Sequence, residues 1–197
     1  MVTLGGGAGI VVNGTTNCTL TTIGHDRSGE LIGFTADHCG GPGSQVAAEG
    51  SGVAVGNIIA ADDHYHYSVI KFDPATVTPV ANFAGFAING IGPDPASGQT
   101  ACKQGAATGN DCQNIRPFLD SQPGRPTGRI HTSYQPGDDG GPVTADNLLV
   151  GMIYNGFTLV GPPNWGSTEI RVIYFSGILA DANAKGGPGA GFSPIPA

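Results

Sequence analysis

The 197-residue chain contains few charged residues, and only 8 of them are Lys or Arg. Charged residues make up 12% of the chain, and the formal net charge is −7. The basic residues form no cluster, so the sequence lacks the basic surface that binds nucleic acid. No apolar run approaches the roughly 20 residues that a membrane-spanning helix needs. We therefore expect neither nucleic acid nor a membrane as a partner, and we expect a monomer.

The four cysteines, Cys18, Cys39, Cys102 and Cys112, include no C-x-x-C pair, so their spacing matches no zinc ribbon. Two local bridges, Cys18–Cys39 and Cys102–Cys112, would each close a modest loop and stabilise the fold by roughly 3 kcal/mol. Four reduced thiols in a cytosolic core are the alternative. An even cysteine count with sparse charge and abundant Gly and Thr favours a secreted protein, and we do not expect the first residues, which run from Met1 directly into a Gly-rich stretch, to act as a signal peptide.

Helix-forming residues do not dominate the sequence, whereas Gly (34) and Pro (15) are abundant. Apolar residues gather in short runs between turn residues, such as GIVVNG, LIGFTA, YSVIKF, NLLVGMIYNG and RVIYF. Many short strands separated by turn signals predict an all-β sandwich or barrel. The only helix that we predict is a short amphipathic segment over 176–186, which Gly186 would end. The Gly- and Pro-rich tail, 186–197, is expected to be flexible.

The strand-like runs fall into two halves of the chain. Pro79, Pro93 and Pro95 make the segment 79–104 a predicted linker between them. We therefore expect one domain over 1–197. Its first lobe would cover about 10–85, and its second lobe, which ends in the helix, would cover about 100–182.

Two short segments carry a resemblance to a known family. TADHC (35–39) resembles the segment that carries the catalytic histidine of chymotrypsin-fold serine proteases, and GDDGGP (137–142) resembles the segment that carries their nucleophile. ACKQGAATGNDC (101–112) looks like the small disulfide loop of the bacterial streptogrisin-type branch, and GMIYNG (151–156) stands where the family has a substrate-binding strand. The resemblance covers most of the chain. It implies two antiparallel six-stranded β-barrels with a short C-terminal helix.

The same resemblance shows where this sequence departs from the family pattern. The nucleophile position holds Asp139 in place of Ser, and His66 in HYSVIKF stands where the family has its orienting Asp. Only His38 remains of the three catalytic groups. A carboxylate that attacked a peptide would form a reactive anhydride, and its charge would oppose the developing oxyanion. We therefore expect no ordinary serine-protease activity, because loss of a triad member removes several powers of ten in rate.

Further residues acquire expected roles from the resemblance. The N–H groups of Gly137 and Asp139 would form the oxyanion hole, and the buried Asp138 would pair with an arginine, either Arg129 or Arg116. His131, on the strand that leads to this loop, is expected to be a wall residue. The expected substrate-binding residues are Ser133 at the pocket floor and Tyr154, Asn155 and Gly156 along an edge where a peptide would add as a strand.

The three catalytic candidates, His38, His66 and Asp139, allow two arrangements. As a 2-His-1-carboxylate set they would bind zinc or another first-row divalent metal, and Asp37 or His64 could join them. His64 is a candidate because side chains two residues apart in a strand lie on the same face, so His64 and His66 would do so if both belong to the predicted strand. As a hydrogen-bonded row, Asp139···His38···His66, they would favour a charged His38 and require no cofactor.

The leading hypothesis is a secreted, non-proteolytic homologue of trypsin-like proteases, whose remodelled cleft binds a peptide or protein segment, or a metal ion. One alternative is a metal-dependent or water-activating hydrolase that uses the His/His/Asp site. A third interpretation is an engineered variant of an active serine endopeptidase, since two catalytic positions differ while the surrounding GD-x-GGP pattern is kept.

Overall fold

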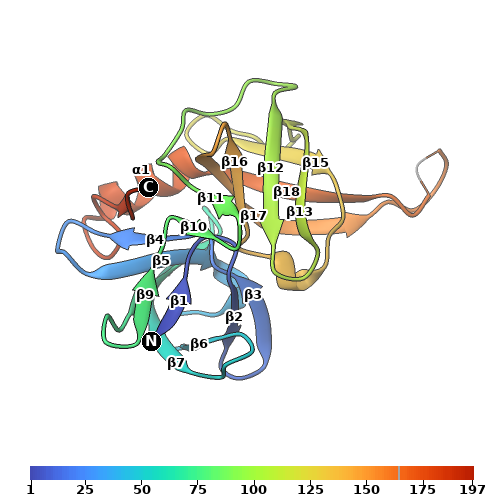
Figure 1. Ribbon diagram of the computed structural model, residues 1–197. Helices are drawn as coiled ribbons and strands as arrows, with labels where there is room; N and C mark the ends of the chain where they lie inside the picture. The colour runs from blue at the N-terminus through green and yellow to red at the C-terminus, as the bar shows by residue number, and fades with distance from the viewer. Residues whose placement is uncertain (164) are drawn as a thin grey trace.

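The computed structural model describes residues 1–163 and 165–197. Two curled, mostly antiparallel sheets form the body of the molecule, one above the other in Figure 1. The first has eight strands in the order β19-β4-β5-β8-β7-β6-β2-β3, and the second has seven in the order β13-β12-β16-β17-β18-β15-β14. The first sheet therefore belongs to the N-terminal half, apart from β19, and the second sheet belongs to the C-terminal half.

The first sheet is made of short strands that follow one another closely in the sequence. They are β2 (Gly9–Val12), β3 (Thr16–Thr19), β4 (Thr22–His25), β5 (Leu31–Ala36), β6 (Gln45–Ala48), β7 (Ala54–Asp62), β8 (Tyr67–Phe72) and the distant β19 (Ser193–Pro194). A 3-10 helix, η1 (Asp37–Cys39), follows β5. Two small pairs lie outside the main sheets: β1 (Val2–Leu4) with β9 (Val77–Pro79), and β10 (Asn82–Phe83) with β11 (Phe86–Ala87).

The second sheet contains the strands that carry the Gly-rich loop. They are β12 (Thr100–Gly105), β13 (Gly109–Asn114), β14 (Arg116–Pro117), β15 (Thr127–His131), β16 (Pro142–Ala145), β17 (Leu148–Thr158) and β18 (Thr168–Tyr174). A second 3-10 helix, η2 (Pro136–Asp138), lies within the loop between β15 and β16. The α-helix α1 (Phe175–Lys185) follows β18 and ends at Gly186, whose φ of 71° suits a residue without a side chain.

The predicted fold class is confirmed: the protein is all-β, with two antiparallel barrel-like sheets and one short C-terminal helix. The sheets contain eight and seven strands, not six each, because short strands such as β14 and β19 pair at their edges. Both predicted disulfides form: Cys18–Cys39 joins β3 to η1, and Cys102–Cys112 joins β12 to β13. Within the described residues, no helix has the length and apolar character needed to cross a membrane.

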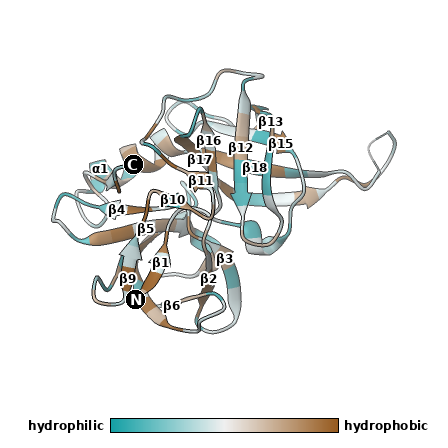
Figure 2. Ribbon diagram, in the orientation of Figure 1, coloured by the Kyte–Doolittle hydropathy of each residue, from teal (hydrophilic) through white to brown (hydrophobic). Residues whose placement is uncertain are grey.

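The hydrophobic core is not divided cleanly between the two sheets. Figure 2 shows hydrophobic stretches along the strands of both lobes. The larger buried cluster includes Phe34 and Val69 of the first sheet, but it also takes in Met152 of β17 and Phe175 of α1. The ring of Phe34 meets that of Phe175 edge-on, with centroids 5.2 Å apart. Burial of such rings joins the helix to the first sheet and fixes the lobes against each other.

The segment after α1 is packed, which corrects the expectation that residues 186–197 are flexible. β19 pairs with β4 through Ser193 and His25. The side chain of Phe192 is 8% exposed, and its ring meets Phe34 edge-on at 5.1 Å. Burying a Phe side chain stabilises a fold by about 1.5–3 kcal/mol. This gain offsets part of the backbone entropy that the Gly- and Pro-rich segment loses when it becomes ordered.

Candidate functional site between the two lobes

His38 lies in η1, at the end of β5, where the first lobe faces the second. The backbone N–H of Asp37 donates to the carbonyl of His66 at 3.0 Å, which ties η1 to the turn before β8. The next residue, Cys39, is held to β3 by its disulfide. Ser68 adds a 2.8 Å hydrogen bond from its hydroxyl to the carbonyl of Gly40. The imidazole therefore projects from a short turn that is fixed on both sides.

The Gly-rich loop of the second lobe is held by threonines of the first. The N–H of Thr19 donates to the carbonyl of Asp139 at 2.9 Å, and its hydroxyl donates to the carbonyl of Gly137 at 2.8 Å. Thr21 donates to the carbonyl of Gly140 at 2.5 Å. Gly140 has a φ of +91°, and a Cβ there would lie 2.2 Å from the carbonyl oxygen of Thr19. This close approach explains why the loop needs glycine.

Asp138 stabilises the loop from inside the second lobe. Its fully buried carboxylate accepts four hydrogen bonds: from the N–H groups of Ala107, Thr108 and Gln135 and from the hydroxyl of Thr108. The prediction of an arginine partner is wrong, because neither Arg116 nor Arg129 contacts this carboxylate. Oriented backbone N–H groups supply the compensation that a guanidinium was expected to give.

The cation nearest to this network is the buried Lys103 of β12. Its ammonium group donates to the Thr108 hydroxyl at 2.5 Å, and that hydroxyl in turn donates to Asp138. Burial lowers the pKa of Lys103, while the charges of Asp138 and Asp111 oppose that shift. Lys103 also lies 3.4 Å from the hydroxyl of Ser133. The expected pocket floor at Ser133 therefore lies against a buried lysine.

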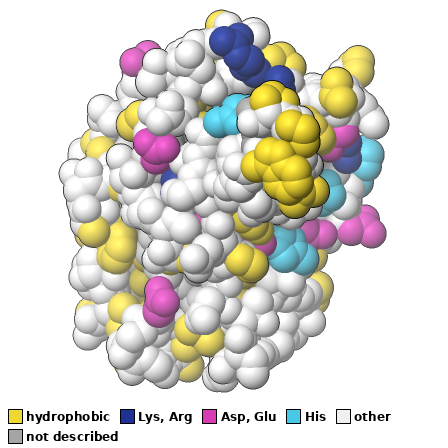
Figure 3. Space-filling model, turned by 90° about the vertical axis from the view of Figure 1, so that its right-hand side faces the viewer, with side chains coloured by type: hydrophobic (Ala, Val, Ile, Leu, Met, Phe, Trp, Pro, Cys, Tyr) yellow, Lys and Arg dark blue, Asp and Glu magenta, His cyan; other side chains and the backbone are white. Residues whose placement is uncertain are grey.

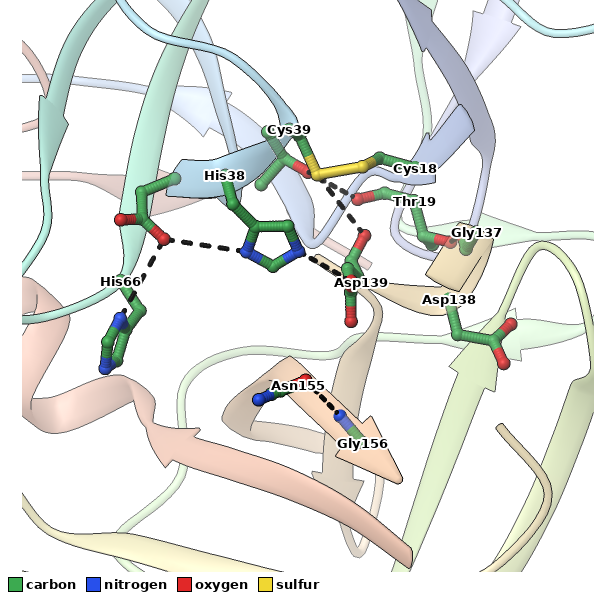
Figure 4. A network of polar contacts seen from close by, with 12 residues as sticks. Cys18, Thr19, His38, Cys39, His66, Gly137, Asp138, Asp139, Asn155 and Gly156 are labelled. Atoms are coloured by element: carbon green, nitrogen blue, oxygen red, sulfur yellow. Dashed lines mark hydrogen bonds and ion pairs between the residues drawn. A yellow bond between two sulfur atoms is a disulfide. The ribbon is translucent and has the colours of Figure 1, made fainter. Parts of the chain in front are cut away.

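His38 and Asp139 meet across the two lobes (Figure 4). His38 Nε2 lies 2.6 Å from Asp139 Oδ2, and the other carboxylate oxygen accepts a 2.8 Å hydrogen bond from the Tyr134 hydroxyl. The Asp139 side chain is 5% exposed. The hydrogen bond with Asp139 raises the pKa of His38 to about 9, and Asp37 contributes to the same shift. This shift is in the direction that the sequence-based expectation of a charged His38 requires.

His66 does not contact His38, which corrects the predicted Asp139···His38···His66 row. Asp37 lies between the two rings: its Oδ1 is 3.8 Å from His38 Nδ1 and 3.9 Å from His66 Nδ1. The ring of His66 instead stacks on Tyr154, with centroids 4.5 Å apart and planes 3° from parallel. Burial lowers the pKa of His66, which is the opposite direction to the shift at His38.

The prediction that His64 and His66 share a strand face is also wrong. Residues 63–66 form a turn, and β8 begins only at Tyr67. His66 has a φ of 59°, which is a left-handed turn conformation. Asp62 stabilises the turn by accepting hydrogen bonds from the N–H groups of His64 and Tyr65. The turn therefore displaces His66 from the position that an extended strand would give it.

The expected metal-ligand set is not assembled. Across residues 1–163 and 165–197, no group of three or more His, Cys, Asp or Glu side chains is arranged to hold a metal ion. His38 already faces Asp139 through one ring nitrogen and Asp37 through the other, and His66 lies beyond Asp37.

The expected oxyanion hole is not open. The N–H of Asp139 donates to the carbonyl of Pro136 at 3.1 Å as part of η2, so it does not point into the cleft. Gly156 is covered as well, because a Cβ there would lie 2.5–2.6 Å from ring atoms of Tyr134. The N–H of Gly156 donates to the side chain of Asn155 at 2.8 Å. The protein's own groups therefore cover one face of Gly156 and engage its N–H.

The sequence matches no protein-family model and no curated protein. Solved structures are similar to it in three dimensions. Protease A of Thermobifida fusca has a TM-score of 0.73 at 18% identity, and each chain is covered completely. A Nocardiopsis protease has a TM-score of 0.71 at 19% identity over 92% of this chain and 97% of its own. A Cellulomonas bogoriensis chymotrypsin has a TM-score of 0.70 at 21% identity, again over both complete chains.

The chain has the chymotrypsin-like fold. The site lies where η1 of the first lobe meets the η2 loop and β17 of the second. Of the residues singled out in the sequence, His38 and Asp139 are in direct contact (Figure 4). Tyr154 is buried, because its hydroxyl donates to Asp120 at 2.9 Å and its ring stacks on His66.

Sequence reasoning missed Tyr134 and underestimated Asp37. Asp37 directly precedes His38, at a position where the chymotrypsin-like fold usually has a small residue, and this was a usable signal. Tyr134 gave none, because its role depends on the loop turning its hydroxyl towards Asp139. Burial and Asp139 together raise the pKa of the Tyr134 hydroxyl, so this group remains a hydrogen-bond donor at neutral pH.

The chemistry of the site is that of a closed ion pair. A general base must be unprotonated, but with a pKa of about 9 only about one His38 in a hundred is neutral at pH 7. Its Nε2, which would receive a proton from a nucleophile, is occupied by Asp139. The pair of His38 and Asp139 is therefore better suited to holding the two lobes together than to transferring a proton.

Proposed function

We propose that this chymotrypsin-fold protein does not cleave peptides by covalent catalysis, and that it binds an extended peptide along the free edge of β17. The observation that carries the proposal is the Asp139 carboxylate, which lies 2.6 Å from His38 and 2.8 Å from the Tyr134 hydroxyl. Acyl transfer needs a nucleophile, a free base and an oxyanion hole. Asp139 is a poor nucleophile towards peptides, His38 is protonated, and one expected oxyanion donor is bonded to Pro136.

The binding part of the proposal rests on the unpaired half of β17. β18 follows this strand as far as Thr158, whereas β16 on the other side ends opposite Met152. Among the residues that the structure describes, the outer edge from Asn155 to Thr158 therefore has no neighbouring strand. The N–H of Gly156 on this stretch donates to the adjacent Asn155 side chain, an acceptor that the backbone of an incoming strand could replace. Backbone pairing at such an edge is a common mode of peptide recognition.

Apolar side chains near this edge favour a peptide over a small polar ligand. Phe157 is 38% exposed, Val160 86% and Trp165 71%. Figure 3, which views the molecule from the side of the β17–β18 hairpin, shows a large hydrophobic patch on this face. Exposed apolar groups beside an open strand edge would contact alternate side chains of a bound peptide. The two disulfides support a secreted location for this activity.

The first test addresses catalysis. The protein is treated with a fluorophosphonate and with small peptide esters, beside the variant His38→Ala. We expect no covalent label and equal, background hydrolysis by both proteins. The double variant Asp139→Ser/His66→Asp should also remain unreactive, because Tyr134 and Pro136 still close the cleft. Labelling of either the parent or the double variant, with the fold intact by circular dichroism, would contradict the proposal.

The second test addresses binding. Trp165 is the only tryptophan, so its fluorescence reports on the hairpin. We expect saturable titration by a capped hexapeptide with alternating apolar side chains. Phe157→Ala should weaken the affinity about tenfold, as expected for loss of a buried aromatic contact. Val53→Ala, which removes a side chain of similar exposure (40%) in the first lobe, is the matched control. An equal loss in both variants, or no titration at all, would sink the peptide-binding proposal.

A further inference from the structure

A polar pocket lies away from the cleft, where the edges of the second sheet meet. Its volume is about 230 Å³, and it is lined by Gln113, Asn114, Arg116, Arg129 and His131. Every one of these side chains can donate hydrogen bonds, and none is a carboxylate. The expectation that His131 is a wall residue holds only in part, because its side chain is 58% exposed and lines this pocket.

The nearby acids are engaged with other partners. The buried Glu169 contacts the guanidinium of Arg171, which is held between the rings of Phe118 and Phe157. Glu169 Oε2 is 3.5 Å from His131 and 3.9 Å from Arg129. Two guanidinium groups, those of Arg171 and Arg129, thus face one carboxylate, and one positive charge is left over.

Asp111, beside Gln113 on β13, does not supply the missing negative charge. Its carboxylate accepts hydrogen bonds from Gln113 and from Thr132, and it is paired across the strands with the buried Lys103. Within the described residues, the Arg116 guanidinium has no hydrogen-bonded or ion-paired side chain.

Arg116 and Arg129 are direct cross-strand partners. The register of β14 and β15 places their Cα atoms opposite each other, so the two Cβ atoms are about 4.5–5.5 Å apart. Like charges in this relation destabilise a sheet. The pairing is notable in a protein with a net charge of −7 and only 8 basic residues. An anion between the two guanidinium groups would convert the repulsion into paired, charge-assisted hydrogen bonds.

We propose that this pocket binds an oxyanion, a phosphate, sulfate or carboxylate group, between Arg116 and Arg129. His131, Gln113 and Asn114 complete the donor set. The volume admits one such group together with a few water molecules. The lining residues include neither His38 nor Asp139, whereas Glu169 and Arg171 connect Arg129 to Phe157 beside the proposed peptide-binding edge.

The test uses inorganic phosphate, titrated by calorimetry at constant ionic strength with chloride as the reference salt. We expect saturable binding, with a matching rise in Tm. Arg116→Gln and Arg129→Gln should each weaken the affinity at least tenfold, since a charge-assisted hydrogen bond corresponds to roughly that factor or more. Arg27→Gln, which makes the same charge change in a turn of the first lobe, should leave the affinity unchanged. Phenyl phosphate distinguishes a free ion, bound equally well, from the end group of a larger ligand, bound more tightly.

A second readout separates an anion site from a merely structural arginine. Without phosphate, Arg116→Gln should leave Tm unchanged or raise it slightly, because it removes like-charge repulsion. With saturating phosphate, the parent should be the more stable protein. The proposal is overturned if phosphate does not bind saturably, if all three variants bind it as the parent does, or if Arg116→Gln lowers Tm equally with and without phosphate.

Discussion

The two lobes share one fold but differ in what they bury. In the first lobe the buried polar side chains are all hydroxyls, those of Thr19, Thr21, Thr22, Thr35, Ser44 and Ser68. In the second lobe they include five ionisable groups, those of Lys103, Asp138, Asp139, Glu169 and Arg171. A buried charge is tolerated only with complete compensation. The first lobe therefore acts as an apolar scaffold, and the second depends on buried polar networks to hold its loops.

The sharpest way to break this contrast is to remove the carboxylate of Asp138. Asp138→Ala leaves three backbone N–H groups and a threonine hydroxyl without their buried acceptor, and we expect it to lower the free energy of unfolding by about 3–5 kcal/mol. Urea unfolding followed by circular dichroism measures the change. Ser68→Ala removes one buried hydrogen bond from the first lobe and should cost only about 1 kcal/mol. Equal losses in the two variants would remove the distinction between the lobes.

The next largest effect is expected from the disulfides, because each lobe contains one and their contributions to stability can be compared. The Cys18–Cys39 bridge spans 21 residues and the Cys102–Cys112 bridge spans 10. On the chain-entropy model, removing them should cost about 3.3 and about 2.7 kcal/mol respectively. Two double variants, Cys18→Ala/Cys39→Ala and Cys102→Ala/Cys112→Ala, test this order through their free energies of unfolding in urea. If loss of Cys102–Cys112 is the more damaging, the polar loop that it closes contributes more than loop entropy.

The smallest expected effect is the pH dependence of the contact between the lobes. The folded-state pKa of His38 is raised to about 9 from 6.5. Its contribution to stability is therefore complete below about pH 6.5 and disappears as the pH rises through 9. The imidazole is 48% exposed, so solvent screening reduces this contribution to about 1 kcal/mol.

Asp139→Asn is the matched control for this titration. It removes the charge that holds His38 protonated, so the pKa of His38 should fall towards 6.5 and the loss of stability between pH 6.5 and 9 should vanish. NMR titration of the His38 ring measures the pKa in both proteins. A His38 that titrates near 6.5 in the parent would show that the ion pair does not close the cleft in solution.

Local sequence patterns predicted the parts of this protein that depend on local chemistry. Alternating apolar runs and turn residues identified the all-β class, and Gly186 identified the end of α1. The contact between His38 and Asp139 followed from two motifs with known relative placement. The partners of Asp138 did not follow, because three backbone N–H groups leave no trace in residue identity. Asp37 and His66 were misjudged because a four-residue turn replaces the first part of an expected strand.

The placement of β19 has a consequence for how the protein is made. β4, formed by residues 22–25, takes its outer neighbour from Ser193 and Pro194, and Phe34 packs edge-on against Phe192. A ribosome delivers these groups more than 150 residues after β4 has emerged. The edge of β4 in the first sheet therefore stays unpaired while the second lobe is synthesised. Folding of the N-terminal lobe is thus completed late, when β19, in the segment that follows α1, pairs with β4.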